Sequence, residues 1–216
     1  MTEREQLPGE EVREGIATSR HDFARFFYWC EGWQTVATGY KRAADLVLDA
    51  MLTESTEIDE LVFPVLFLYR HWLELSIKDC LDLSRLAGRM TEEDFKNQLD
   101  HRLEGHLRSL RGAFEDEEMQ VAIGRGEERH NLSESFAVLE TWMRRFSEFD
   151  PGSFRCRYPI AKDGKQHPFP SLEDGLGGTS VAALRREMDN LEAAIGDISS
   201  ALTAEIDHRQ TNSRRQ

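Results

Sequence analysis

Apolar residues near the C-terminus recur at alternating steps of three and four, and this periodicity constrains the fold more than any other feature. The pattern runs without interruption through Val181, Leu184, Met188, Leu191, Ile195, Ile198 and Leu202. Such spacing places all of these side chains on one face of a helix, as in a coiled-coil seam. We expect a helix capped by Thr179 or Ser180 that packs its seam either within a bundle or against a second chain.

Helical periodicity also covers the first half of the chain. An amphipathic helix is expected at residues 34–52, with a buried face of Val36, Tyr40, Ala43, Val47 and Met51. A long helix is expected at about 57–87, with a stop at Gly88. It contains Pro64, and because a proline costs about 3 kcal/mol in a helix interior, the helix should start or kink there.

Other segments complete the helical pattern. A short helix should begin at Asp22, a further helix should span 91–112, and residues 113–130 should form a short helix and a loop. Residues 131–149 predict a strong helix that ends at Asp150-Pro151-Gly152 and buries Leu132, Phe136, Leu139, Met143 and Phe146.

Residues 150–178 break the helical period. Phe154, Cys156, Tyr158 and Ile160 alternate with arginines, which is a period of two, and Asp163-Gly164 is a turn signal. We expect a small β-hairpin in a long loop. The fold class is therefore all-α: an antiparallel bundle of five to six helices with a hairpin appendage.

The same patterns set the expected domain organisation. Residues 19–207 should form a single helical-bundle domain that carries 150–178 as an insertion. The acidic residues 1–18 and the C-terminal residues 208–216 should be flexible.

Net charge, cysteine content and the length of apolar runs limit the possible partners and the cellular compartment. The net charge is −13 over 216 residues, which excludes a generally basic surface and general DNA binding. Cys30, Cys80 and Cys156 are widely spaced without a CxxC pair, which favours a reducing compartment. The longest apolar run, Leu61–Tyr69, is far shorter than the roughly 20 residues of a membrane span. We expect a cytoplasmic protein with no membrane partner.

The long central helix carries an unusual polar arc. At about 100° per residue, Arg70, His71, Glu74 and Lys78 occupy one narrow sector of an otherwise apolar helix. The sector is bordered by Phe63, Phe67 and Leu81. One interpretation is a solvated face with i,i+4 ion pairs. The alternative is that the arc lines a cleft or an interface, because charges there are costly unless they serve a function.

Two further groups are ambiguous. His106 lies between Leu103, Leu107 and Leu110, so it is either a core histidine or a functional one, whereas His101 should be exposed. Arg157 is either a surface residue or a two-pronged donor to an anionic ligand or to Glu74. We expect the apolar side of the hairpin to cover the border of the arc and Arg157 to reach Glu74.

Motifs for common mechanisms are absent from the sequence. It contains no GxxxxGK[ST], no GxGxxG after a strand, no HExxH and no GxSxG. Its histidines do not cluster at metal-ligand spacings. We therefore expect no cofactor and no bound metal.

Three short motifs together resemble a group of bacterial helical proteins of the HEPN superfamily. They are YRHWLELSIK at 69–78, GHLRSL at 105–110 and DPGSFRCRYP at 150–159. The resemblance implies a helical bundle, a homodimer and a metal-independent endoribonuclease in a toxin or defence setting. The catalytic residues that it implies are Arg70, His71, Glu74 and His106. The ligand-binding residues that it implies are Lys78, Asp150, Ser153, Arg157 and Tyr158.

The chain departs from that family in one respect. HEPN ribonucleases carry an Arg-x4–6-His motif. The one literal match here runs from Arg125 to His130, but it has Gly126 where a polar residue is usual and lies in a glycine-containing segment. Two function classes therefore stay open. One is the endoribonuclease, with RNA as its partner. The other is a non-catalytic helical module that binds a protein or a small anionic ligand, which the acidic net charge favours.

Overall fold

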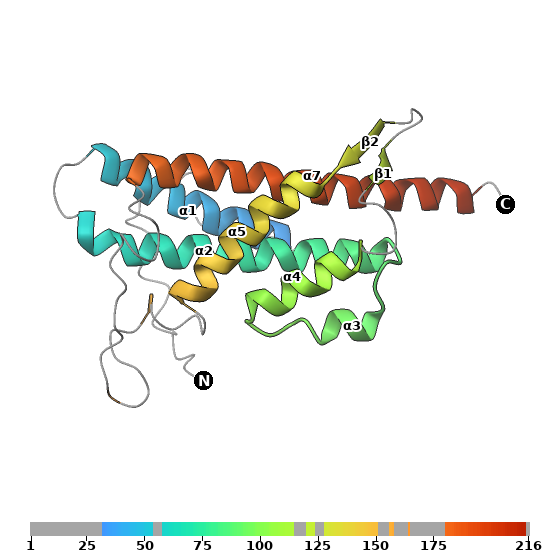
Figure 1. Ribbon diagram of the computed structural model, residues 1–216, viewed down its shortest axis with the longest axis horizontal. Coiled ribbons are helices and arrows are strands. Elements are labelled where there is room, and N and C mark those ends of the chain that lie inside the picture. The colour runs from blue at the N-terminus through green and yellow to red at the C-terminus, as the bar shows by residue number, and fades with distance from the viewer. Residues whose placement is uncertain are drawn as a thin grey trace, which may run out of the picture. The chain divides into compact units, whose positions relative to one another are not determined.

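The computed structural model describes residues 32–53, 58–114, 120–123, 128–150, 156–157, 164 and 180–214. These residues form six helices and a pair of short strands (Figure 1). The elements are α1 (Trp33–Thr53), α2 (Ile58–Leu86), α3 (Glu92–Lys96), α4 (Leu103–Gly112), β1 (Gln120–Ile123), β2 (Glu128–Asn131), α5 (Ser133–Phe149) and α7 (Val181–Ser213). The predicted all-α class is confirmed. Among the described residues, none of the helices combines the length and apolar character that a membrane span requires.

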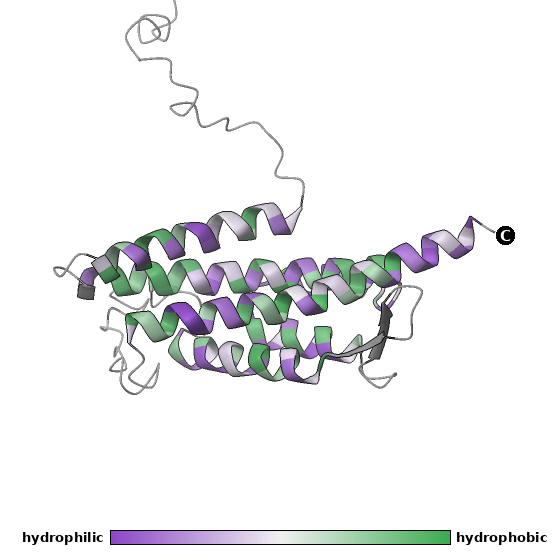
Figure 2. Cartoon of the chain, turned by 90° about the horizontal axis from the view of Figure 1, so that it is seen from above, coloured by the Kyte–Doolittle hydropathy of each residue, from purple (hydrophilic) through white to green (hydrophobic). Residues whose placement is uncertain are grey.

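Helix α2 is the centre of the bundle. It contacts α1, α3, α4 and α7, while α5 packs against α7 and α4. Figure 1 shows α1 and α2 running in opposite directions, as do α5 and α7. Apolar residues of the helices alternate with polar ones along each ribbon in Figure 2, as the sequence periodicity predicts. The segments that form the candidate site, described below, are each held in place by contacts with α2.

The seam of α7 packs inside the bundle. Leu184, Met188, Leu191, Ile195, Ile198 and Leu202 are buried, and α7 contacts α5, α2 and α1. Ser180 caps the helix by accepting a hydrogen bond from the backbone N–H of Ala183 at 3.2 Å. The helix continues to Ser213, beyond its predicted end at 207. Glu205 explains part of this extension, because it accepts from Arg89 at 2.6 Å and from Arg209 at 2.7 Å.

The buried face of α1 differs from the prediction. Its buried residues are Ala37, Lys41, Ala44, Leu48 and Met51, so four of the five predicted positions are displaced by one residue. Val36, Tyr40 and Val47 are partly buried against the core. The face at full depth includes Lys41, whose ammonium lies 2.9–3.2 Å from carboxylates of Asp45, Asp189 and Glu192. A prediction from hydrophobic residues alone does not place a lysine in the core. Here three ion pairs offset the cost of removing the Lys41 charge from water.

Helix α2 begins at Ile58 and runs through Pro64, so it does not start at the proline. It ends as predicted at Gly88, whose φ is 70°. There the N–H of Arg89 donates to the carbonyl of Ser84, and the N–H of Gly88 donates to that of Arg85, each at 2.9 Å. These bonds form a Schellman motif, which requires the left-handed backbone that glycine adopts without strain.

Two predicted segments have a different structure. In place of one helix at 91–112, α3 and α4 are separated by a loop at 97–102, in which the Arg102 N–H donates to the Asp100 carboxylate at 3.0 Å. In place of a helix and loop at 113–130, β1 and β2 pair antiparallel, with Gln120 opposite Asn131. A side chain that caps the backbone locally competes with helix continuation, which accounts for the break near Asp100.

The hairpin predicted at 150–178 is not shown. Cys156 and Arg157 lie in a turn rather than in a strand, and Gly164 adopts a positive φ of 79°. Apart from Asp150, the other residues of that segment lie outside the described residues, as do the predicted helix from Asp22 and the segment 1–18.

The end of α2 provides a stability prediction. Gly88→Ala should lower the free energy of unfolding by about 1–2 kcal/mol, because alanine is strained at positive φ and its Cβ would lie 2.6 Å from Arg209 Nη1. Gly196→Ala, inside α7 with no atom within 4 Å of the added Cβ, should instead raise it by about 0.5–1 kcal/mol. Urea unfolding followed by circular dichroism measures both. Shifts of the same sign would contradict the assigned helix end.

Candidate functional site

The polar arc of α2 is buried. Arg70 and Glu74 are each 1% exposed and Lys78 is 3% exposed. This excludes the interpretation of the arc as a solvated face. Arg70, Glu74 and Lys78 lie against other parts of the bundle, while His71 is partly exposed. The alternative, that the arc lines a cleft or an interface, stays a prediction. Burying three charged side chains on adjacent turns is costly unless each charge has partners, so the contacts of each group decide what the site can do.

The guanidinium of Arg70 joins three segments. Its Nε donates to the backbone carbonyl of Asp150 at 3.2 Å, at the end of α5. Its Nη2 donates to the carbonyl of His101 at 3.4 Å, in the loop between α3 and α4, and Nη1 lies 3.4 Å from Glu74 Oε2. All three guanidinium nitrogens are therefore engaged with acceptors of the protein, and Arg70 acts as a structural tie between α2, α5 and the loop.

The carboxylate of Glu74 is the negative centre of the site. Its Oε1 accepts a hydrogen bond from Lys78 Nζ at 2.9 Å and lies 2.8 Å from His101 Nδ1. Burial alone would raise the pKa of Glu74, but the contacts with Lys78 and His101 outweigh it and hold the pKa below its usual range. Glu74 is therefore ionised at neutral pH. Lys78 Nζ also lies 5.7 Å from the ring centre of Trp33.

His101 combines exposure with a buried partner. Its side chain is 73% exposed, although its Nδ1 touches a carboxylate that is 1% exposed. Because the two ring nitrogens lie on opposite sides of the imidazole, contact through Nδ1 leaves Nε2 directed away from Glu74. This is the arrangement of a histidine oriented by a carboxylate for proton transfer. The predicted exposure of His101 is correct, but sequence reasoning did not select it as a site residue.

His71 lies among aromatic rings. Its ring centre is 4.4 Å from that of Tyr40, edge to face, and 5.9 Å from that of Phe67, stacked. Burial lowers its pKa more than nearby Glu74 raises it, so the ring is neutral at neutral pH. Arg157 places its guanidinium 5.5 Å from the Phe67 ring centre. Arg157 thus lies on the aromatic border of the arc, while the Glu74 carboxylate is contacted by Arg70, Lys78 and His101.

His106 fits the core alternative. It is 0% exposed, and its Nε2 lies 3.2 Å from Asp100 Oδ1 without good hydrogen-bond alignment. Burial lowers its pKa and Lys78 lowers it further, against smaller opposing effects of Asp100 and Glu74. Asp150 is also fully buried. Ser153 and Tyr158, the other predicted ligand-binding residues, lie outside the described residues.

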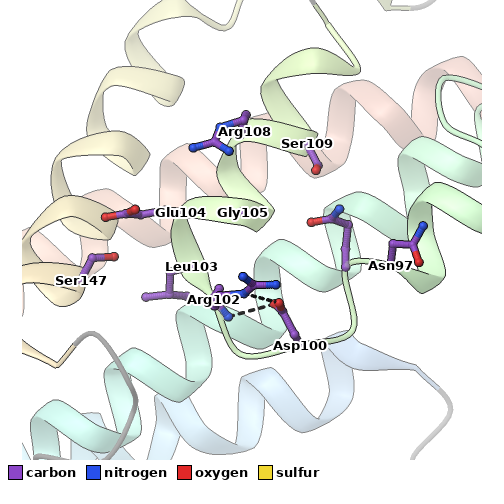
Figure 3. A pocket seen from close by; sticks show the side chains of 10 residues that line it. Asn97, Asp100, Arg102, Leu103, Glu104, Gly105, Arg108, Ser109 and Ser147 are labelled. Carbon is purple, nitrogen blue, oxygen red and sulfur yellow. Dashed lines mark hydrogen bonds and ion pairs between the residues drawn. The ribbon is translucent and has the colours of Figure 1, made fainter.

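A cleft of about 430 Å³ adjoins the loop that carries His101. Its polar lining includes Asp100, Arg102, Glu104, Arg108, Ser109 and Ser147 (Figure 3). Arg102 Nε donates to Asp100 at 2.6 Å, which neutralises that carboxylate. Asp100 and Arg102, on either side of His101, therefore line a cleft that offers guanidinium and hydroxyl donors, the groups that bind phosphate oxygens. Glu104 adds a carboxylate to the same cleft, and His101 itself adjoins the lining without being part of it.

Metal and family comparisons add no further assignment. Within the described part of the chain, no group of three or more His, Cys, Asp or Glu side chains is placed to hold a metal ion. Comparison with known proteins finds no family model, no curated protein and no solved structure that matches the chain. The superfamily resemblance therefore stays a prediction.

Removal of the negative centre provides a test of burial. Glu74→Ala should lower the free energy of unfolding by about 3–5 kcal/mol, because it leaves two buried cations without a carboxylate. Glu74→Ala combined with Lys78→Ala should cost less than the sum of the single changes. The matched control is Glu148→Ala, whose side chain is 65% exposed and 4.0 Å from Arg144.

The control should shift stability by less than about 0.5 kcal/mol. Urea unfolding of the four proteins measures all of these changes. A Glu74→Ala effect as small as that of Glu148→Ala would show that the arc is accessible to water.

Proposed function

We propose that this chain is a HEPN-like, metal-independent endoribonuclease in which His101 transfers the proton and Glu74 orients it. The observation that carries the proposal is the 2.8 Å contact between the exposed imidazole of His101 and the buried carboxylate of Glu74. A carboxylate that fixes the ring through Nδ1 leaves Nε2 as the proton acceptor, which is the requirement for a general base. The superfamily resemblance supports RNA as the substrate.

The reaction needs three functions. His101 Nε2 removes the 2′-hydroxyl proton, the 2′ oxygen attacks phosphorus, and the bond from phosphorus to the 5′ oxygen breaks. The proton on His101 then passes to the leaving 5′ oxygen, so the products are a 2′,3′-cyclic phosphate and a 5′-hydroxyl. Cations must stabilise the charge on the pentacoordinate phosphorus, and Arg102 and Arg108 in the adjoining cleft suit this role.

Arg70 and Lys78 have a different role from the one expected. Both are buried, and their contacts are with Glu74 and, for Arg70, with backbone carbonyls. In the proposed mechanism they keep Glu74 ionised and in place, and they do not touch the phosphate. Both are therefore positioning residues, as Glu74 itself is.

Net charge limits how RNA is bound. A chain with a net charge of −13 repels a polyanion at long range, so affinity depends on the few local cations near His101. Few phosphate contacts imply a shallow dependence of affinity on salt. The homodimer and the toxin or defence setting rest on the superfamily resemblance alone.

A second candidate is a non-catalytic module that binds a small anionic ligand or a protein. The observation that favours it is the saturation of Arg70, whose guanidinium is 1% exposed and donates only to the protein at its described contacts. Buried charged groups whose hydrogen-bond donors are all paired within the protein are typical of a structural core. In this case the cleft beside Arg102 would bind without chemistry.

Two histidine variants and one glutamate variant distinguish these functions. Cleavage of a labelled single-stranded RNA by the full chain, in the presence of EDTA, should fall at least about 100-fold in His101→Ala, the range expected for loss of a general base. Glu74→Gln should retain part of the activity. His208→Ala should be unchanged, because His208 is exposed on α7 and contacts only Asn212 at its described hydrogen bond. A 2′-deoxy substrate should not be cleaved.

His130→Ala tests the literal motif of the superfamily. Loss of cleavage in His130→Ala with normal cleavage in His101→Ala would move the site to β2 and overturn the assignment. RNA that is bound by the wild-type chain but not cleaved would support the binding module instead.

A further inference from the structure

We propose that residues 91–102 form a pH-gated flap that closes over α2 while His106 is neutral and opens when His106 is protonated. The flap consists of Thr91, α3 and the loop that leads into α4. Its opening would uncover Arg70 and Glu74. This inference goes beyond the proposed ribonuclease activity and applies equally if the chain is a binding module.

The flap is weakly held compared with the rest of the bundle. No residue from 91 to 102 is buried, and α3 has only five residues. Its contacts with the end of α2 are an ion pair of Glu92 with Arg85 at 3.2 Å and the ring of Phe95, 5.5 Å from the Arg85 guanidinium. Segments with few buried apolar contacts open at low free energy, without unfolding of the whole domain.

Polar contacts at the other end close the flap. The His101 carbonyl accepts from Arg70, and the His101 ring touches Glu74. Asp100 lies 3.2 Å from His106 Nε2. These three contacts place the flap directly over the buried charges, so its position decides whether Arg70 and Glu74 meet solvent.

His106 is poorly placed to accept a charge while the flap is closed. It is 0% exposed, and neither ring nitrogen has a hydrogen-bond partner of good geometry among the described residues. The backbone of Gln98 in the flap favours the protonated ring, but its effect on the pKa is smaller than that of burial. The charged groups that act on it are Lys78 and Glu74 from α2 and Asp100 from the flap. On the α5 side, the described ion pair of α4, Arg111 with Glu140, lies at the opposite end of that helix.

Asp100 favours a protonated His106, but by less than burial and Lys78 disfavour it. Its carboxylate already accepts from Arg102 Nε at 2.6 Å and from the Arg102 backbone N–H at 3.0 Å. Because Asp100 and the rest of the loop cover His106 from one side, displacement of the flap is the smallest movement that hydrates the ring. Hydration removes the desolvation penalty on the imidazolium.

The direction of the pH dependence follows from linkage. The pKa of His106 is lowered when the flap is closed, so the open state binds more protons. Closure is fully stabilised above the ordinary histidine pKa of about 6.5 and is lost as the pH falls below it. The pKa of Glu74 is lowered too, so its contribution is lost only at pH values below the ordinary glutamate range.

Amide hydrogen exchange tests the flap without any substrate, so its result is separate from that of the RNA assay. After correction for the intrinsic pH dependence of exchange, protection of amides in 95–106 should fall severalfold from pH 7.5 to 5.5, up to a ceiling of about tenfold, because an open-state imidazole with the ordinary pKa of about 6.5 takes up at most one proton over this range. Peptides of α5 and α7 should not change. His106→Gln should abolish the fall.

His71→Gln is the matched control. His71 is a second histidine of lowered pKa near the same charged groups, but it is only half-buried and its ring packs on Tyr40 and Phe67 of α1 and α2. This variant should behave as wild type. Equal loss of protection in every peptide, constant protection of 95–106, or a fall that persists in His106→Gln would each overturn the proposal.

A second measurement covers the case in which His106→Gln does not fold at pH 7.5. His106→Leu is then used, and the imidazole of His106 is titrated by NMR in the wild-type chain. A midpoint below the ordinary histidine value that coincides with loss of protection in 95–106 supports the flap. A midpoint at or above that value overturns it.

Discussion

The contact of Glu74 with two cations and a histidine is the interaction on which the rest of the site depends. Arg70 and Lys78 lie one turn before and one turn after Glu74 on α2, and all three are buried. A lone carboxylate at that depth would be protonated or would destabilise the fold. With its partners it stays charged, and an ionised carboxylate can in turn hold an exposed imidazole. Arg70 extends this arrangement to the end of α5 and to the loop at 97–102.

Another buried cation, Lys41, is used in a similar way between α1, α2 and α7. Lys41 is surrounded by Asp45, Asp189 and Glu192, and the Tyr69 hydroxyl donates to Asp45 at 2.7 Å. Apolar seams alone leave neighbouring helices free to slide by one turn at modest cost. Buried charges do not permit that displacement, because each shift would leave an ion without its partner. The two polar networks therefore fix the register of helices whose attraction comes from apolar packing.

The sequence predicted the elements whose signal is local. Helices α7, α5 and α2 were predicted from apolar residues spaced three and four apart. Gly88 marks the end of α2 and Ser180 the start of α7, and both signals are adjacent in sequence to the helix that they bound. The most buried face of α1 is displaced by one residue from the predicted one, although Val36, Tyr40 and Val47 still pack against the core. Burial of Lys41 could not be predicted because two of its carboxylate partners lie on α7. The polar arc was identified, but its burial was left open because the same spacing suits a surface. His101 was not selected because 27 residues separate it from Glu74, and only the break between α3 and α4 brings them together.

The position of Arg70, Glu74 and Lys78 on one helix has a consequence for the order of folding. Pairs at i and i+4 form within a single helix before it meets any neighbour. In a solvated helix each such pair contributes only about 0.2–0.5 kcal/mol, but it needs no contact that is distant in sequence. The groups that lose water when α2 packs are therefore opposite charges on adjacent turns rather than three isolated ions. Local contacts of this kind carry little loop-closure entropy, whereas the contacts with His101 and with the Asp150 carbonyl require the chain to close loops of 27 and 80 residues.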